Sequence, residues 1–325
     1  MASNKNEVVL IGPSSPVLER GLAALTVHNL SAATDAESFI ADHADIGAIV
    51  CGATTQTISG SLMARFPKLE ILASFGVGYD RIDVKWAAAH GVVVTNTPNV
   101  LTEEVADTAL GLLLCTVREF SQADRFVRAG KWVEQGYPLS KATLRNRTVG
   151  IVGMGAIGQA IARRLDGFGV PLVYHTRRPR RDLAYRHYPK LADMARDVDI
   201  LLIIVPGGAA TQNMIDAQVL DALGPDGILI NMARGSVVDE PALIKALQEK
   251  RIMSAGLDVY ANEPEIPAAL MAMENVVLFP HLGSASVYTR ERMEQLVVDN
   301  ILAWAAGTPP LTPVPETPWR SWSKV

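Results

Sequence analysis

The sequence has very little cysteine. Only Cys51 and Cys115 occur among 325 residues, each inside an apolar segment. Two isolated thiols give neither a disulfide framework nor metal-ligand spacing, so we expect two small core residues and no metal site. This cysteine usage is typical of a reducing compartment, most simply the cytoplasm.

Long hydrophobic runs and an excess of positive charge are also lacking. No uncharged apolar run approaches the roughly 18 residues that cross a bilayer, and the N-terminal residues carry no signal pattern, so we expect no membrane association. A net charge of −4 and a pI near 5.9 argue against a general nucleic-acid binder. With 49% hydrophobic and 20% charged residues, the chain has an ordinary globular composition and is long enough for two domains.

What the sequence does contain is a regular alternation of short β-branched runs and longer amphipathic stretches. This alternation predicts parallel sheets covered by helices on both faces. A long helix over about 102–129 and a last helix over about 286–306 are expected, the latter followed by an extended proline-rich tail. The expected strands are 8–12, 47–52, 69–76 and 92–96 in a first series, then 148–153, 171–176, 199–206, 227–233, 254–260 and 276–280 in a second.

The two series predict two domains. Six near-continuous apolar strands with intervening helices are typical of a doubly wound dinucleotide-binding sheet. If the last helix packs back on the first series, the first domain is discontinuous. We therefore expect an α/β protein with two doubly wound parallel-sheet domains. They are a flavodoxin-like substrate-binding domain (residues 1–98 plus 287–325) and a Rossmann dinucleotide-binding domain (residues 99–286).

The stretch "TVGIVGMGAIGQAIARRL" places three glycines between an expected strand and an expected helix. Gly153 allows a tight turn, Gly155 lets the backbone approach a pyrophosphate, and Gly158 lets helix and strand pack closely. The helix N-terminus then offers free N–H groups to the phosphates. The alternative is a glycine-rich turn without a ligand. The expected cofactor contacts here are Gly153, Gly155, Ala156, Ile157 and Gly158.

The next strand runs into the basic loop "HTRRPRR", where dinucleotide-binding chains that use NAD carry an acid beside the adenosine ribose. A guanidinium beside a hydroxyl matches a phosphate dianion, which predicts a preference for NADP(H). Thr176 and Arg177 are the expected first contacts, with Arg178 close by. Arg180 and Arg181 are expected to face water or the next helix, and a solvated basic loop without a ligand is the alternative.

Three charged or titratable residues end the last three apolar strands, where α/β sheets bind ligands: Arg234, Glu263 and His281. Each alone could be structural, but three together beside a cofactor fold favour catalysis. A histidine is a natural proton donor to a ketone that receives a hydride, and a carboxylate paired with the imidazole favours its protonated form. Arg234 would hold a substrate carboxylate and polarise the ketone.

The motifs "GMGAIG", "NMARGSVVDE", "GLDVYANEP" and "FPHLGSAS" together resemble those of the D-2-hydroxyacid dehydrogenases, and within them the NADPH-dependent glyoxylate/hydroxypyruvate reductases. The resemblance covers nearly the whole chain, including "ASFGVGYDRID" and "NTPNVLTEEVADTALGLLL". It implies that Arg234, Glu263 and His281 are the catalytic residues.

The resemblance also implies further contacts. Asp258 would hydrogen-bond the nicotinamide carboxamide, although as a bare sequence feature it could be a turn former. The "FGVGYD" loop would bind the substrate carboxylate through Phe75, Val77 and Gly78. Trp132 matches an aromatic that closes a neighbouring subunit's site in related reductases, or packs under its own loop. The remaining expected cofactor contacts are Thr108, Val205, Pro206, Thr211, Met232, Ala233 and Gly283.

The expected activity is therefore the NADPH-dependent reduction of a small 2-oxo acid, such as glyoxylate or hydroxypyruvate, to the D-2-hydroxy acid. One alternative is an aryl or branched 2-oxo acid reductase of the hydroxyphenylpyruvate type, which would differ in pocket volume. A dinucleotide-sensing binding module resembling the C-terminal-binding corepressors is another, although this chain lacks their long basic tail. The apolar long helix predicts a symmetric homodimer packed through the cofactor domain.

Overall fold

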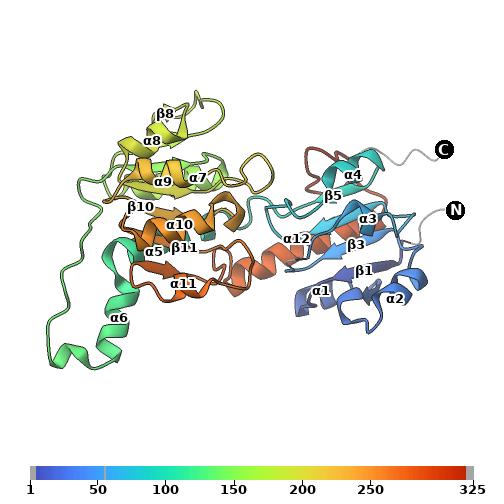
Figure 1. Cartoon of the computed structure of the whole chain (residues 1–325). Coiled ribbons are helices and arrows are strands. Elements are labelled where there is room, and N and C mark those ends of the chain that lie inside the picture. Colours follow the sequence, from blue (N-terminus) through green and yellow to red (C-terminus); the bar gives the residue numbers. More distant parts are fainter. Residues whose placement is uncertain (1–4, 55, 320–325) are drawn as a thin grey trace. The chain divides into compact units, whose positions relative to one another are not determined.

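Parallel sheets form the centre of both units into which the chain divides. The structure is a computed structural model that describes residues 5–54 and 56–319. The first unit lies within residues 1–101 and 286–325, and the second lies within residues 102–285. Figure 1 shows a helix-covered sheet in each unit.

The first unit contains a five-stranded parallel sheet in the order β2-β1-β3-β4-β5. This is the 2-1-3-4-5 order of flavodoxin-like folds. Its strands are β1 (Glu7–Ile11), β2 (Thr26–Asn29), β3 (Ala48–Cys51), β4 (Ile71–Ser74) and β5 (Val93–Thr95). Its helices are α1 (Pro16–Gly21), η1 (Leu30–Ala32), α2 (Ala36–Asp42), α3 (Gly60–Met63), α4 (Val84–Ala89) and α12 (Val287–Ala305).

Strand β1 shows why this sheet is covered on both faces. Successive side chains point to opposite faces of a strand, so Val8 and Leu10 pack with α1 and α12 while Val9 and Ile11 pack with the other helices. Trp304 of α12 is fully buried, and its Nε1 donates to Glu70 at 2.7 Å. The last helix therefore belongs to the core of the first unit.

The proline-rich segment after α12 lies along β5. The Val314 amide donates to the Val94 carbonyl oxygen at 2.9 Å, and Pro313 forms a bridge with Thr95. The side chain of Val314 is buried in the same core. The expected extended tail is thus an edge partner of this sheet.

The second unit contains a seven-stranded parallel sheet in the order β12-β11-β10-β9-β6-β7-β8. It is the 3-2-1-4-5-6 order of a Rossmann sheet, extended by one strand. Its strands are β6 (Val149–Val152), β7 (Leu172–His175), β8 (Arg186–Tyr188), β9 (Ile200–Ile203), β10 (Ile228–Asn231), β11 (Ser254–Leu257) and β12 (Val276–Leu278). Its helices are α5 (Thr102–Arg118), α6 (Phe120–Arg128), η2 (Lys131–Val133), α7 (Ala156–Asp166), α8 (Leu191–Asp197), α9 (Ala217–Leu223), η3 (Gly235–Val237), α10 (Glu240–Gln248) and α11 (Ala268–Met271).

The predicted fold class is confirmed, and two details differ. The expected single helix over about 102–129 is two helices, because Glu119 between α5 and α6 adopts a left-handed backbone with φ of 56°. Helix α6 has no buried residue and stands out from the sheet in Figure 1. Strands β2 and β8, at sheet edges, were not expected from the sequence. The side chains of an edge strand are less buried than those of a central strand. For this reason neither segment is an apolar run in the sequence.

No helix among residues 5–54 and 56–319 combines the length and apolar character needed to cross a bilayer.

Candidate active site

The glycine-rich turn after β6 has the geometry of a phosphate cradle. Gly153 has φ of +102°, and a Cβ added there would lie 2.5 Å from the Ile204 carbonyl oxygen. A Cβ at Gly158 would overlap the Gly153 carbonyl oxygen, so α7 packs tightly on the end of β6. At Gly155, by contrast, no described atom lies within 4 Å of such a Cβ.

The open side of this turn fits a diphosphate. Gly155 is the N-cap of α7, and among the described residues no side chain caps the helix and no acid lies in its first turn. The first amides of a helix have no intrahelical acceptor and attract anions. Ala156, Ile157 and Gly158 provide these amides. Val205 borders the turn, with its Cγ1 2.9 Å from the position of a Cβ on Gly153.

The basic loop after β7 has two differently placed sets of arginines. The Thr176 hydroxyl donates to the Arg178 carbonyl oxygen at 2.7 Å. Arg177 and Arg178 are exposed, and no described group pairs with their guanidinium groups. The Arg180 side chain is 39% exposed, as expected for a residue that faces water, but its Nη1 also donates to the Met154 carbonyl oxygen at 3.2 Å, a contact that the sequence did not predict.

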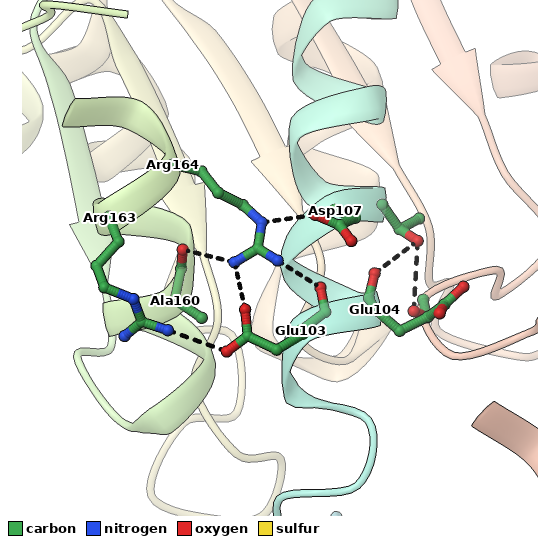
Figure 2. Close-up of polar contacts among 8 residues, drawn as sticks. Glu103, Glu104, Asp107, Ala160, Arg163 and Arg164 are labelled. Atoms are coloured by element: carbon green, nitrogen blue, oxygen red, sulfur yellow. Dashed lines mark hydrogen bonds and ion pairs between the residues drawn. The ribbon is translucent and has the colours of Figure 1, made fainter. Parts of the chain in front are cut away.

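Helix α7 is joined to the first two turns of α5 by an ion-pair network. Figure 2 shows Arg163 and Arg164 of α7 directed toward Glu103 and Asp107 of α5. Arg164 also donates to the carbonyl oxygens of Ala160 and Glu103, at 3.0 and 3.2 Å. Exposed ion pairs stabilise little individually, but one guanidinium shared among several acceptors fixes how the two helices meet.

Thr108, also on α5, contacts the loop that follows β12. Its hydroxyl is 3.0 Å from the Glu104 carbonyl oxygen and 3.4 Å from that of Gly283. In the loop after β9, the Thr211 hydroxyl donates to the Pro206 carbonyl oxygen at 2.7 Å and closes that loop.

The segment after β10 holds Arg234 in place. Asn231, the last residue of the strand, accepts from the Ala233 amide at 3.0 Å and donates to the Arg234 carbonyl oxygen at 3.1 Å. Met232 and Ala233 are buried. The Arg234 Nη1 donates to the Ala233 carbonyl oxygen at 2.8 Å. The side-chain amide of Asn231 therefore sets the turn from which this guanidinium projects.

Glu263 and His281 come from the segments after β11 and β12 and are in direct contact. His281 Nδ1 lies 2.9 Å from Glu263 Oε2, and Glu263 Oε1 accepts from the Tyr260 amide at 3.1 Å. The carboxylate is 12% exposed and the imidazole 46%. A carboxylate held on both oxygens orients the ring through Nδ1, so Nε2 is the nitrogen left for another molecule.

Asp258 organises the loop that carries His281. It is 2% exposed, and its carboxylate accepts from the amides of Leu282 at 2.6 Å and Gly283 at 3.0 Å. Its carbonyl oxygen accepts from the His281 amide at 2.9 Å. Burial raises the pKa of Asp258 above its ordinary value, against the opposing effect of these amides and of His281.

The three strand ends are packed together through backbone. A Cβ on Gly235 would overlap the backbone of Tyr260, which places the residue after Arg234 directly against the segment that leads to Glu263. The Tyr260 hydroxyl donates to the Phe279 carbonyl oxygen at 2.9 Å, two residues before His281. Neither Tyr260 nor Asn231 was singled out from the sequence, since a buried tyrosine and a strand-end asparagine carry no motif of their own.

The loop after β4, in the first unit, contains Phe75, Val77 and Gly78. Gly76 has φ of +120°, and its amide donates to the Thr97 hydroxyl at 3.0 Å. The Asn96 side-chain amide donates to the Val77 carbonyl oxygen at 2.9 Å. Polar residues that follow β5 thus hold this loop, a support that was not predicted from the sequence.

In the described part of the chain, no three His, Cys, Asp or Glu side chains are grouped so that they could hold a metal ion. Cys51 and Cys115 are both free. Burial raises the pKa of the Cys51 thiol to about 12, which makes it a core side chain rather than a nucleophile.

Known proteins resemble this chain closely. The family model for the D-isomer specific 2-hydroxyacid dehydrogenase NAD binding domain matches residues 110–283. A glyoxylate/hydroxypyruvate reductase A of Arabidopsis thaliana is 46% identical over 265 residues, which cover 82% of this chain and 84% of the relative. A hydroxyphenylpyruvate reductase of Plectranthus scutellarioides is 43% identical over 276 residues, with 85% and 88% covered.

A solved structure is similar over almost the whole chain. It is an NADPH-dependent glyoxylate/hydroxypyruvate reductase from Sinorhizobium meliloti in complex with NADP and malonate. It is 49% identical in sequence, with a TM-score of 0.91, and the match covers 98% of this chain and 99% of that one.

Proposed function

This chain belongs to the D-isomer specific 2-hydroxyacid dehydrogenase family, and from that membership we propose that it uses NADPH to reduce a small 2-oxo acid to the D-2-hydroxy acid. Glyoxylate and hydroxypyruvate are the proposed substrates, because the Arabidopsis and Sinorhizobium relatives carry those names. The observation that carries the proposal is the 2.9 Å contact between His281 and Glu263 at the strand ends of a Rossmann sheet.

His281 is the proposed proton donor. When bound, the dihydronicotinamide supplies a hydride to the carbonyl carbon, and negative charge develops on the carbonyl oxygen. Glu263 holds the ring through Nδ1 and stabilises the imidazolium, so Nε2 can donate a proton to that oxygen. The 46% exposure of the imidazole is consistent with access by a substrate.

Arg234 is proposed to bind the substrate carboxylate and polarise its ketone. A guanidinium can contact a carboxylate and a neighbouring carbonyl oxygen at once, which aligns the carbon for hydride transfer. The amides of Val77 and Gly78, in the loop with Phe75, are proposed as further ligands of the substrate carboxylate. Asn231 and Asn96 support these two segments.

The cofactor is proposed to lie along the carboxyl ends of β6, β7 and β9 in the second unit. The turn from Gly153 to Gly158 would hold the diphosphate, and Asp258 would accept a hydrogen bond from the carboxamide. Thr176, Arg177 and Arg178 would bind a 2′-phosphate, which is the basis of the proposed preference for NADPH. The remaining proposed cofactor contacts are Thr108, Val205, Pro206, Thr211, Met232, Ala233 and Gly283.

We further propose a homodimer formed through the second unit. Trp132, Val133 and Leu139 are 67%, 93% and 95% exposed, and all three lie in or after η2. A set of large apolar side chains exposed on one segment marks an interaction surface. Equilibrium sedimentation should therefore give twice the mass of one chain.

The two free cysteines support a reducing compartment such as the cytoplasm.

The second candidate substrate class is aryl 2-oxo acids, which the similarity to the Plectranthus hydroxyphenylpyruvate reductase favours. The test is kcat/KM for glyoxylate, hydroxypyruvate, hydroxyphenylpyruvate and a branched 2-oxo acid, each with NADPH and with NADH. The proposal predicts the highest values for the two small acids with NADPH. Highest values for hydroxyphenylpyruvate would support the alternative, and a higher value with NADH would contradict the cofactor assignment.

A further inference from the structure

Arg180 lies in the basic loop but does not share the environment of Arg177 and Arg178. Its Nε and Nη2 donate to the two carboxylate oxygens of Asp182, at 2.9 and 2.5 Å. Asp182 has its pKa lowered to about 2, chiefly by this hydrogen bonding to Arg180. The pair is therefore ionised throughout any ordinary assay range. A bidentate pair of this kind fixes the plane of the guanidinium.

The remaining guanidinium nitrogen reaches the glycine-rich turn. Arg180 Nη1 donates to the carbonyl oxygen of Met154, the residue between Gly153 and Gly155. Met154 is buried, so its backbone does not shift freely. One side chain thus joins the loop after β7 to the turn after β6.

Tyr174 fixes the backbone of Arg180 from the opposite direction. Its hydroxyl accepts from the Arg180 amide at 2.8 Å and donates to the Arg180 carbonyl oxygen at 3.3 Å. The tyrosine is on β7 and is 1% exposed, so this hydroxyl is anchored in the sheet. At the start of the loop, His187 Nε2 lies 2.9 Å from the Thr176 carbonyl oxygen. Both ends of the loop are therefore tied to the sheet.

We propose that Arg180 is a positioning residue that sets the distance between the diphosphate-binding turn and the arginines of the 2′-phosphate loop, and thereby determines specificity for NADPH over NADH. A dinucleotide phosphate has two anionic groups that must be bound at once. Holding the two binding segments in register beforehand removes the entropic cost of ordering the loop when the cofactor binds. NADH has no 2′-phosphate to contact the basic loop, so it gains little from this restraint. The inference rests on the proposed function, because it presupposes a 2′-phosphate at Arg177 and Arg178.

If Arg180 bound the 2′-phosphate directly, removing a nearby negative charge would strengthen cofactor binding. A positioning role for Arg180 predicts the opposite effect. Asp182→Asn leaves the Arg180 guanidinium one acceptor oxygen in place of two and removes one negative charge near the loop, so simple electrostatics predicts tighter binding of a phosphate. The positioning role predicts weaker binding, since the guanidinium loses its orientation. Tyr174→Phe changes no charge and tests the same restraint from the other side.

The matched control is Arg181→Ala. Arg181 is the next residue, is exposed, and its side chain makes no hydrogen bond or ion pair in the described part of the chain. It carries the same charge at nearly the same place in the sequence. The change in cofactor affinity in Arg181→Ala measures the long-range electrostatic attraction of the basic loop for the anionic cofactor, which salt screens.

The experiment measures the dissociation constants of NADP⁺ and NAD⁺ for the full-length protein and the three variants by calorimetry, with thermal unfolding to verify folding. Asp182→Asn and Tyr174→Phe should each weaken NADP⁺ binding about fivefold, the effect of one typical hydrogen bond, while NAD⁺ changes less than about twofold. Arg181→Ala should stay within about twofold for both. The kcat at saturating NADPH should be unchanged.

Unchanged or tighter NADP⁺ binding in Asp182→Asn would overturn the inference and leave the proposed function standing. Equal losses for NADP⁺ and NAD⁺ would also overturn it, since they would indicate a general structural effect. Tighter binding of NAD⁺ than NADP⁺ by the unmodified protein would overturn the proposed cofactor preference itself, and this inference with it.

Discussion

Glu263 Oε2 lies 2.9 Å from His281 Nδ1, and the other oxygen of the same carboxylate accepts from the Tyr260 amide. The carboxylate is thereby held in one orientation and in turn orients the imidazole. This arrangement comes from the ends of two adjacent parallel strands, β11 and β12, whose carboxyl ends lie at the same edge of the sheet.

The first prediction concerns His281. His281→Ala should lower kcat for glyoxylate about a hundred- to ten-thousandfold, the usual contribution of a general acid. NADPH binding should persist, because the cofactor is proposed to be held by other residues. Steady-state kinetics and a separate fluorescence titration of NADPH measure the two effects. Near-normal turnover in this variant would assign the proton donor to another group.

A second prediction separates orientation and charge at Glu263. Glu263→Gln keeps the size of the side chain but carries no negative charge beside the imidazole of His281, so kcat for reduction should fall. The pH profile of kcat from 5 to about 10 measures this change. Glu265→Gln is the control, since Glu265 is exposed two residues further on. Superimposable profiles for Glu263→Gln and the unmodified enzyme would show that the carboxylate does not act through its charge.

Alanine substitutions at two glycines of the glycine-rich turn should have different effects, one on stability and the other on NADPH binding. Gly158→Ala places a Cβ on the Gly153 carbonyl oxygen, so it should destabilise the protein by about 1–3 kcal/mol through overpacking. Gly155→Ala meets no described atom within 4 Å. It should leave the unfolding temperature nearly unchanged and weaken NADPH binding, because the added methyl group occupies the face proposed for the diphosphate. Unimpaired NADPH binding by Gly155→Ala would place the cofactor elsewhere.

The raised pKa of Asp258 predicts a pH dependence of stability. Because the folded pKa exceeds the ordinary value of 3.8, the folded protein holds this proton to a higher pH than the unfolded chain does. The stabilisation is full below the ordinary pKa and is lost as pH rises through the folded pKa. The unfolding temperature of the unmodified protein should therefore fall relative to that of Asp258→Asn as pH rises above the ordinary aspartate pKa. A constant difference, or a change in the opposite sense, would refute this.

Much of the fold was predictable because buried parallel strands are short apolar runs. The glycine spacing identified the βα turn, and the fold class, the family and the enzyme class expected from the sequence are confirmed. Edge strands β2 and β8 were missed because "TVHN" and "RHY" lack that apolar character. The end of α5 was missed because a glutamate in a left-handed conformation has no sequence signature.

The candidate site was predictable where side chains end strands, as for Arg234 and His281. Its supports were not predictable in the same way. Tyr260, Asn231 and Arg180 act through contacts with backbone atoms that are distant in sequence, and only the folded structure brings these together. The roles assigned to the site residues, the preference for NADPH and the homodimer stay predictions.

The most direct measurement follows a label through the proposed reaction. Hydroxypyruvate is incubated with the enzyme and with NADPH that carries deuterium at both C4 positions of the nicotinamide, and the product is analysed by chiral chromatography and mass spectrometry. The account predicts D-glycerate with deuterium on C2, because the hydride passes directly to the carbonyl carbon while the proton on oxygen comes from His281. L-Glycerate, or glycerate without the label, would contradict it.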